Sequence, residues 1–352
     1  MLADRIEHKW IACFAEQFAK CALSPGETVA ILSETQSRAL NVHLAELAAL
    51  SLGARVFHLV LPTERTPYPV PVRSTGASEA IGGLAPVVQA LASSSLVVDL
   101  TLQGLMHAKE TAAILKGGAR ILSISNEHPE ALERMRPDDA LMAEVKAATK
   151  RLRAAKRMQV ASAAGTDLTI RMEGATTVGV WGWTDRPGTL AHWPGGIVVS
   201  FPAAGTVNGT LVLDVGDINL TFKRYLTGRV RLVIENDYIV AIEGEGTDAE
   251  LMRRYLAAWG DREAYAVSHV GFGLNRAARY EALTMYDQRD TNGTELRAVA
   301  GNFLFSTGAN EFAGRFTAGH FDIPVMGCDI RIDGELVIRR GELTDAFRRN
   351  RA

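Results

Sequence analysis

The chain has 352 residues, of which 47% are hydrophobic and 22% charged, and this composition argues against a disordered or fibrous protein. Its length exceeds that of most single hydrophobic cores, so we expect one large or two ordinary domains. The formal net charge of -2 provides no electrostatic field that would collect nucleic acid or anionic membrane, which favours a small-molecule partner.

The first 155 residues alternate helical and strand patterns. Strands without polar alternation, separated by amphipathic helices, are typical of a parallel sheet covered on both faces, so an α/β domain is predicted over residues 1–155. The predicted helices cover 5–20, 37–52, 78–92 and 107–116, the strands cover 27–32, 55–61, 96–100 and 119–124, and a Pro-rich loop covers 63–73. No GxGxxG pattern follows the first strand, so a dinucleotide site has little support.

The pattern changes near residue 157 to short β-rich runs. Predicted strands cover 159–162, 168–172, 196–201, 210–214, 230–235 and 238–243, and one helix covers 248–259. Asn208-Gly209 and Glu235-Asn236-Asp237 have the composition of hairpin turns. The basic stretch at 146–157 has helical periodicity with acidic residues nearby, which favours a solvated helix face over a nucleic-acid site. We therefore predict a β-rich α+β domain over residues 156–352 that carries the functional site.

The cysteines and the N-terminal residues indicate the cellular compartment of the protein. Cys13, Cys21 and Cys328 form neither a zinc-binding spacing nor a disulfide framework, which favours a reducing cytoplasm. The charged, amphipathic start of the chain is unlike a secretory signal, and no run reaches the roughly 18 apolar residues that span a bilayer. A cytoplasmic homo-oligomer without a membrane or nucleic-acid partner is expected.

Two histidines and a carboxylate form the most informative pattern. His320 and Asp322 lie two apart in an extended segment and should point to the same side, while His269 would arrive from another strand. Such a set can hold ferrous iron with one face of the metal open. With 8 His and 40 acidic residues, an acidic residue two positions after some His is expected about once by chance. On spacing alone, the alternative in which His320 bonds a neighbouring strand and Asp322 caps a turn before Pro324 stays open.

Further candidates surround this pattern. His107 follows a predicted parallel strand, and ligands bind at the carboxyl ends of such strands. His192 lies near Trp183 and Trp193, where aromatic faces beside an imidazole suit a flat heteroaromatic ring, although core packing of these tryptophans is an equal alternative. Asp214 and Asp217 are three positions apart, an odd spacing that would put them on opposite faces of a strand, so turn roles are favoured over a shared metal site. Met106, Ser306 and Thr307 are further candidate substrate contacts, with a buried strand as the alternative for the last two.

Five ordered blocks resemble the 2,5-dihydroxypyridine 5,6-dioxygenase family, which is more distantly similar to the aminopeptidase T metallopeptidases. These blocks are HWPGGIVVSFP (192–202), GTLVLDVGDINLTFKRY (209–225), SHVGFGLN (268–275), GNFLFSTG (301–308) and GHFDIP (319–324). The resemblance implies a non-haem site with one Fe(II) per chain on His269, His320 and Asp322, and active-site roles for His107 and His192. One departure is Val180, which is apolar where a substrate-facing glutamate is expected.

The resemblance further implies an extradiol-like cleavage of 2,5-dihydroxypyridine, or a related hydroxypyridine, between C5 and C6 in nicotinate- or picolinate-type catabolism. Molecular oxygen and a small aromatic N-heterocycle would be its partners. The main alternative is an aminopeptidase T-like metallohydrolase in which divalent metal activates water. Against it, the turn at 201–206 lacks the carboxylate expected in a two-metal site. A ligand-binding protein without metal or turnover is a third possibility.

Overall fold

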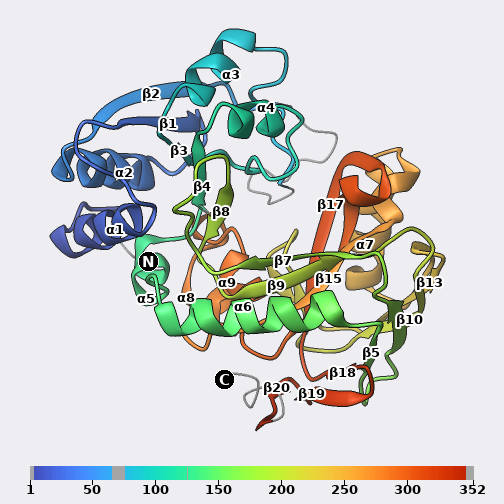
Figure 1. Ribbon diagram of the computed structural model, residues 1–352. Helices are drawn as coiled ribbons and strands as arrows, with labels where there is room; N and C mark the ends of the chain where they lie inside the picture. The colour runs from blue at the N-terminus through green and yellow to red at the C-terminus, as the bar shows by residue number, and fades with distance from the viewer. Residues whose placement is uncertain (1–3, 66–75, 125, 346–352) are drawn as a thin grey trace.

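The computed structural model describes residues 4–65, 76–124 and 126–345, so the predicted Pro-rich loop lies largely outside the described residues. Figure 1 shows a lobe built on a parallel sheet beside a larger β-rich lobe, with the long helix α6 (Asp139–Ala154) running along the latter. The predicted fold class is confirmed. Among the described helices, none is both long and apolar enough to cross a bilayer.

The first lobe contains a five-stranded parallel sheet. Its strands, in spatial order, are β2 (Arg55–Leu61), β1 (Thr28–Glu34), β3 (Leu96–Asp99), β4 (Arg120–Ile124) and β8 (Leu190–Trp193). One face packs against α1 (His8–Lys20) and α2 (Ala39–Ser51), and the other against α3 (Ala85–Ala92) and α4 (Thr111–Lys116). The central strands β1, β3 and β4 are buried along nearly their whole length, which explains their continuous apolar sequences.

The predicted boundary at residue 155 does not contain the whole parallel sheet. Strand β8 lies well beyond it and pairs in parallel with β4, with Ser123 opposite His192 and Ile124 opposite Trp193. The chain thus enters the β-rich lobe and returns to complete the first sheet. This return places His192 at the border of the two lobes.

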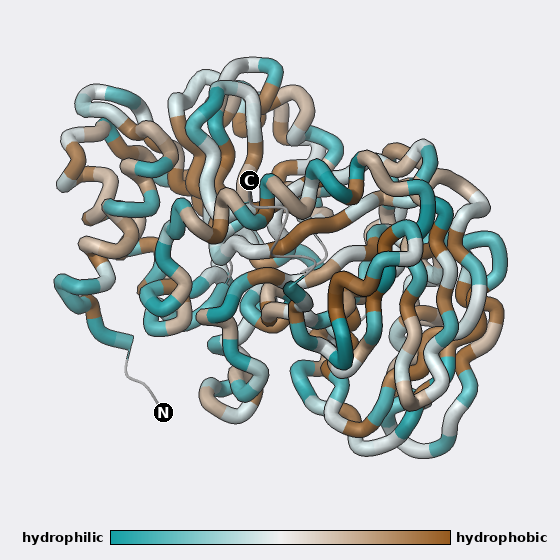
Figure 2. The backbone as a smooth tube through the Cα atoms, turned by 60° about the horizontal axis from the view of Figure 1, so that its bottom comes forward, coloured by the Kyte–Doolittle hydropathy of each residue, from teal (hydrophilic) through white to brown (hydrophobic). Residues whose placement is uncertain are grey.

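Two antiparallel sheets form the second lobe. The larger contains β14 (Tyr238–Glu243), β13 (Val230–Glu235), β10 (Val207–Leu213), β6 (Asp167–Arg171), β5 (Arg157–Ala161), β18 (Asp329–Ile332), β19 (Glu335–Arg339) and β20 (Glu342–Leu343). The smaller contains β17 (Arg315–Val325), β16 (Phe303–Asn310), β15 (Val267–Gly273), β9 (Ile197–Phe201) and β7 (Thr176–Val180). Apolar residues of both sheets, α6 and α7 (Thr247–Ala258) share one core. Figure 2 shows hydrophobic segments running through the strands of both lobes.

Shorter elements complete the structure. They are α5 (Pro129–Arg134), α8 (Ala282–Met285), α9 (Thr294–Ala298), the strands β11 (Ile218–Asn219) and β12 (Arg224–Tyr225), and the 3-10 turns η1 (Arg262–Tyr265), η2 (Gln288–Asp290) and η3 (Glu311–Ala313). Of these, α9 and η3 border the candidate site described below.

Several predicted elements differ in detail. The helices predicted at 78–92 and 107–116 begin at Ala85 and Thr111, because turns occupy the preceding residues. The Asn208-Gly209 hairpin prediction is wrong, since both residues lie inside β10 and pair with β6. Asn236 and Asp237 do form the β13–β14 turn, with φ of 47° and 77°, the left-handed pair that a tight hairpin requires.

Candidate metal centre

The predicted triad meets across three neighbouring strands. His269 lies on β15, while His320 and Asp322 lie on β17, with β16 between them. On β16, Gly308 pairs with His320 and Ser306 pairs with Asp322. A Cβ at Gly308 would collide with the backbone of Gly319 on β17, so glycine permits this close pairing of the two strands.

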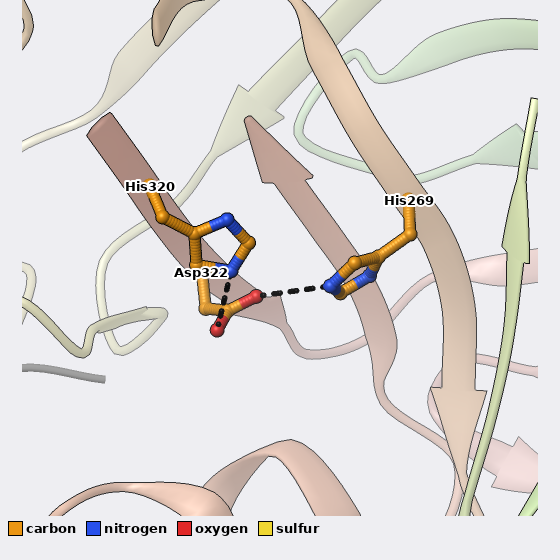
Figure 3. Close-up of side chains that lie close together, drawn as sticks. All are labelled: His269, His320 and Asp322. Carbon is orange, nitrogen blue, oxygen red and sulfur yellow. Dashed lines mark ion pairs between the residues drawn. The ribbon is translucent and has the colours of Figure 1, made fainter. Parts of the chain in front are cut away.

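The triad is compact and buried. The Nε2 atom of His320 lies 3.2 Å from Asp322 Oδ2, and that of His269 lies 3.7 Å from Asp322 Oδ1. Dashed lines mark both contacts in Figure 3. The imidazole ring centroids are 5.6 Å apart. All three residues are less than a tenth exposed. His320 and Asp322 point to the same side of β17, as alternation along a strand predicts.

The geometry fits a single metal ion. One ligand atom from each residue lies within 4.8 Å of the others. Imidazole nitrogens and carboxylate oxygens bind divalent transition metals at about 2.0–2.2 Å, so two ligands of one ion lie up to about 4.4 Å apart. The buried Oδ1 of Asp322 accepts no hydrogen bond from any described residue, which leaves it available to a metal.

Two members of the triad, His269 and Asp322, have the protonation state that metals require. Burial lowers the pKa of His269 to about 3, which keeps the ring neutral. Burial raises the pKa of Asp322, but Arg297 and His320 outweigh it and hold this pKa well below its usual range. A neutral imidazole and an ionised carboxylate bind metal without first losing a proton.

Arg297 is a buried cation beside the triad. Its Nε atom lies 2.6 Å from Asp322 Oδ2, and its Nη1 donates to Thr294 Oγ1 at 2.9 Å. Both arginine and threonine belong to α9, whose residues Thr294–Ala298 are all buried. The guanidinium therefore engages one carboxylate oxygen and leaves the other facing His269.

His107 reaches the site from the first lobe. Its Nδ1 lies 2.8 Å from Glu311 Oε1, and its ring centroid lies 5.9 Å from that of His320. Burial raises the pKa of Glu311, but the hydrogen bond with His107 outweighs it and holds this pKa below the usual value. A carboxylate on Nδ1 favours the tautomer whose Nε2 is free to accept a proton.

His192 enters the site at the end of β8. Burial, reinforced by the charge of Arg297, lowers its pKa to about 4, so its imidazole is neutral at physiological pH. Its Nδ1 is buried and has no hydrogen-bond partner among the described residues. Together with His107, the triad and Arg297, it lines a cavity of about 70 Å³.

The remaining predicted contacts divide into two groups. Met106 and Trp183 line a larger chamber next to the metal centre, and Met106 also borders the small cavity. Trp193, Ser306 and Thr307 are not brought to either cavity. Trp193 packs in the core of the first lobe and donates from Nε1 to the Met135 carbonyl, and Ser306 bonds the backbone of His269.

Strand alternation explains the position of Trp193, because neighbours on a strand face opposite sides and His192 faces the cavity. Sequence reasoning missed Glu311 and Arg297. Arg297 lies on α9, a helix that was not predicted, and Glu311 follows a strand without any motif around it. The predicted turn roles of Asp214 and Asp217 are confirmed by the hydrogen bond from the Asp214 N–H to Asp217 Oδ2.

The turn at 201–206 supplies no second metal site. Its backbone N–H groups at Gly205 and Thr206 donate to the buried Asp237, whose carboxylate also pairs with Arg315. Within the described part of the chain, the triad is the one group of three clustered side chains with metal-ligand geometry. The arrangement therefore suits one metal ion with histidines on the open side.

The chain is similar to known proteins along most of its length. The family model for 2,5-dihydroxypyridine 5,6-dioxygenase matches residues 9–345. A 2,5-dihydroxypyridine 5,6-dioxygenase from Pseudomonas putida KT2440 is 38% identical over 322 residues, which cover 90% of this chain and 91% of that protein. The solved structure of 2,5-dihydroxypyridine dioxygenase from the same organism has a TM-score of 0.89 at 35% identity and 98% coverage of both chains. Wild-type AmpT from Thermus thermophilus shares the fold, with a TM-score of 0.59 at 16% identity over 96% of this chain and 99% of AmpT.

Proposed function

Because the chain belongs to the 2,5-dihydroxypyridine 5,6-dioxygenase family, we propose that it is a cytoplasmic ring-cleaving dioxygenase that uses one Fe(II) per chain. Its substrate would be 2,5-dihydroxypyridine or a closely related hydroxypyridine of nicotinate- or picolinate-type catabolism. Extradiol-like cleavage between C5 and C6 inserts both atoms of oxygen, and 2,5-dihydroxypyridine would yield N-formylmaleamic acid. The buried His269, His320 and Asp322 triad carries this proposal.

The donor set favours iron chemistry. Two imidazoles and one carboxylate are the ligands of non-haem Fe(II) oxygenases, and they leave coordination positions for oxygen and substrate. Bound iron would supply the electron transfer between a closed-shell ring and triplet oxygen. The protein would contribute a neutral His269, an ionised Asp322 and a buried set of ligands.

His107 is the better placed general base. Its hydrogen bond with Glu311 fixes the ring and stabilises the imidazolium that forms when Nε2 takes the proton of a ring hydroxyl. The depressed pKa of His192 makes it a weaker base, and its unpartnered Nδ1 suits a hydrogen bond to the bound ring. We therefore assign proton removal to His107 and substrate orientation to His192.

The decisive experiment combines metal analysis with turnover. His320→Ala and Asp322→Ala should each abolish Fe(II) binding and oxygen-dependent loss of the pyridine absorbance together, because each removes one of three ligands. His43→Ala is the matched control, since His43 is exposed on α2 far from the triad in the sequence.

Three other results of these experiments would contradict the proposed dioxygenase function. Turnover retained after iron is lost would refute the proposal. Two divalent metals per chain with peptide cleavage in the absence of oxygen would instead support an aminopeptidase T-like hydrolase, and a protein that binds the ring without metal or turnover would be a binding protein.

A further inference from the structure

The small metal cavity adjoins a much larger chamber. The cavity beside the triad has a volume of about 70 Å³, and the adjoining chamber has about 480 Å³. The two spaces share part of their walls, formed by Met106, His107, Val180, His192, Val199 and Phe201. A molecule whose reactive ring lies at the triad can therefore extend into the chamber.

Apolar side chains form most of the chamber beyond this shared wall. Trp181, Trp183 and Leu115 line its interior, while Phe312 and Phe316 stand at its rim with about 60% of their surface exposed. The charged residues Lys109, Arg186 and Glu311 also line the chamber, but the first two are solvent-exposed and Glu311 is paired with His107.

The hydroxyl groups in the chamber wall are already engaged by the protein. Thr111 donates to the Leu105 carbonyl at 2.5 Å, and Thr189 donates to the Arg186 carbonyl at 2.6 Å. Thr184 shares a hydrogen bond with Thr189. The wall thus offers few polar groups to a ligand and favours apolar contact.

Lysines on other elements hold the two indoles in place. The ammonium of Lys20 lies 5.3 Å from the ring centroid of Trp183, and that of Lys146 lies 5.1 Å from that of Trp181. Cation–π contacts of this length stabilise the orientation of an aromatic ring. These contacts favour the orientation in which the two indoles line the chamber.

An unsubstituted dihydroxypyridine would fill only part of the two spaces. The ring with its two hydroxyls has eight non-hydrogen atoms, whereas the chamber volume corresponds to roughly sixteen water molecules at about 30 Å³ each. Ligand pockets of about 300–1,000 Å³ usually enclose larger molecules. Val180, on the wall shared by the two spaces, adds no charge that would favour a polar substituent.

We propose that the chamber binds an apolar alkyl or aryl substituent of the ring, so that the preferred substrate is a substituted 2,5-dihydroxypyridine. This inference rests on the proposed function. When C5 and C6 face the triad, the opposite bond of the ring is C2–C3. Since C2 carries a hydroxyl, a substituent on C3 points most directly away from the metal and into the chamber.

The test is a substrate series of 2,5-dihydroxypyridine and its 3-methyl, 3-ethyl and 3-butyl derivatives with the iron-loaded enzyme. Burial of each methylene should raise kcat/KM by about fourfold while the chamber fills. Anaerobic titration, followed through the fluorescence of the chamber tryptophans, should give the same ranking in Kd. Oxygen uptake on none of these rings would refute the proposed function itself. Uptake on the parent ring, with kcat/KM unchanged or falling along the series, would overturn the chamber proposal alone.

A matched pair of variants localises the effect. Ala112 lines the chamber, and its neighbour Ala113 on α4 does not, although both are exposed. Ala112→Phe should fill the space and reduce the ratio of kcat/KM for the 3-butyl ring over the parent ring by at least tenfold, whereas Ala113→Phe should keep that ratio. Equal ratios in the two variants would overturn the proposal.

Discussion

Replacing Arg297 by Met tests whether this arginine substitutes for the metal charge beside Asp322. The two groups lie 2.6 Å apart and both are buried, so their attraction is about 6 kcal/mol at an effective dielectric constant of about 20. Desolvation offsets part of this energy, and removal of one partner from a buried pair typically costs about 3–5 kcal/mol. The metal-free variant should therefore be markedly less stable.

The expected loss can be stated as a melting temperature. An unfolding entropy of about 2.1 cal/mol/K per residue gives about 0.74 kcal/mol/K for 352 residues, so the loss corresponds to about 4–7 °C. A bound divalent ion supplies new positive charge to Asp322. Anaerobic loading with Fe(II) should therefore recover most of the loss, which thermal unfolding with and without Fe(II) would measure.

Arg315→Met provides the matched control. Arg315 is also buried and pairs with a buried carboxylate, Asp237, at 3.0 Å, but that carboxylate is not a triad member. Its variant should lose comparable stability and recover none of it beyond the Fe(II) effect on the unmodified chain. Equal recovery in the two variants, or none in Arg297→Met, would refute the reasoning.

Four further substitutions test other parts of the structure. Glu311→Gln should lower kcat by about tenfold or more with little change in KM or iron content, because it removes the charge that stabilises protonated His107; unchanged kcat would exclude that role. His107→Asn should lower kcat by about 10²–10⁴-fold, whereas His192→Asn should mainly raise KM, and steady-state kinetics would separate these effects. Burial lowers the pKa of His128 to about 4, so the folded state binds fewer protons than the unfolded state between pH 4 and 6.5. The free energy of unfolding should therefore fall as the pH drops from 6.5 towards 4. His128→Asn should flatten the pH dependence of the unfolding free energy in that window, and an identical slope would contradict the assignment.

Short sequence patterns predicted those strands whose bounds depend only on neighbouring residues in the chain. The strands at 55–61, 230–235 and 238–243 have the predicted bounds, since apolar content and turn residues define them directly. The pairing of β8 with β4 depends on residues about seventy positions apart, so no window of the sequence contains it. The predicted domain boundary at residue 155 therefore leaves β8 outside the first domain, although this strand pairs with β4.

The residues of the candidate site also fall into those with a local sequence signal and those brought in by tertiary packing. Alternation on one strand placed His320 and Asp322 together, His269 was expected from another strand, and the family blocks contain all three residues. Arg297 and Glu311 reach the site through tertiary packing of a short buried helix and a turn, neither of which has a periodic signal. Trp193 lies in the core and not at the cavity, because adjacent residues on a strand face opposite sides and its neighbour His192 faces the cavity.

The late return of β8 also affects how the protein can fold during synthesis. Until residue 193 has left the ribosome, β4 has an unpaired edge, and such edges template pairing with other chains. A fragment ending at residue 155 would keep that edge permanently and should aggregate. In the finished sheet the partly exposed β8 replaces the fully buried β4 as the edge strand, so we expect β8 to protect the nascent chain. Any circular permutation or truncation should therefore keep residues 190–193 together with the first four strands.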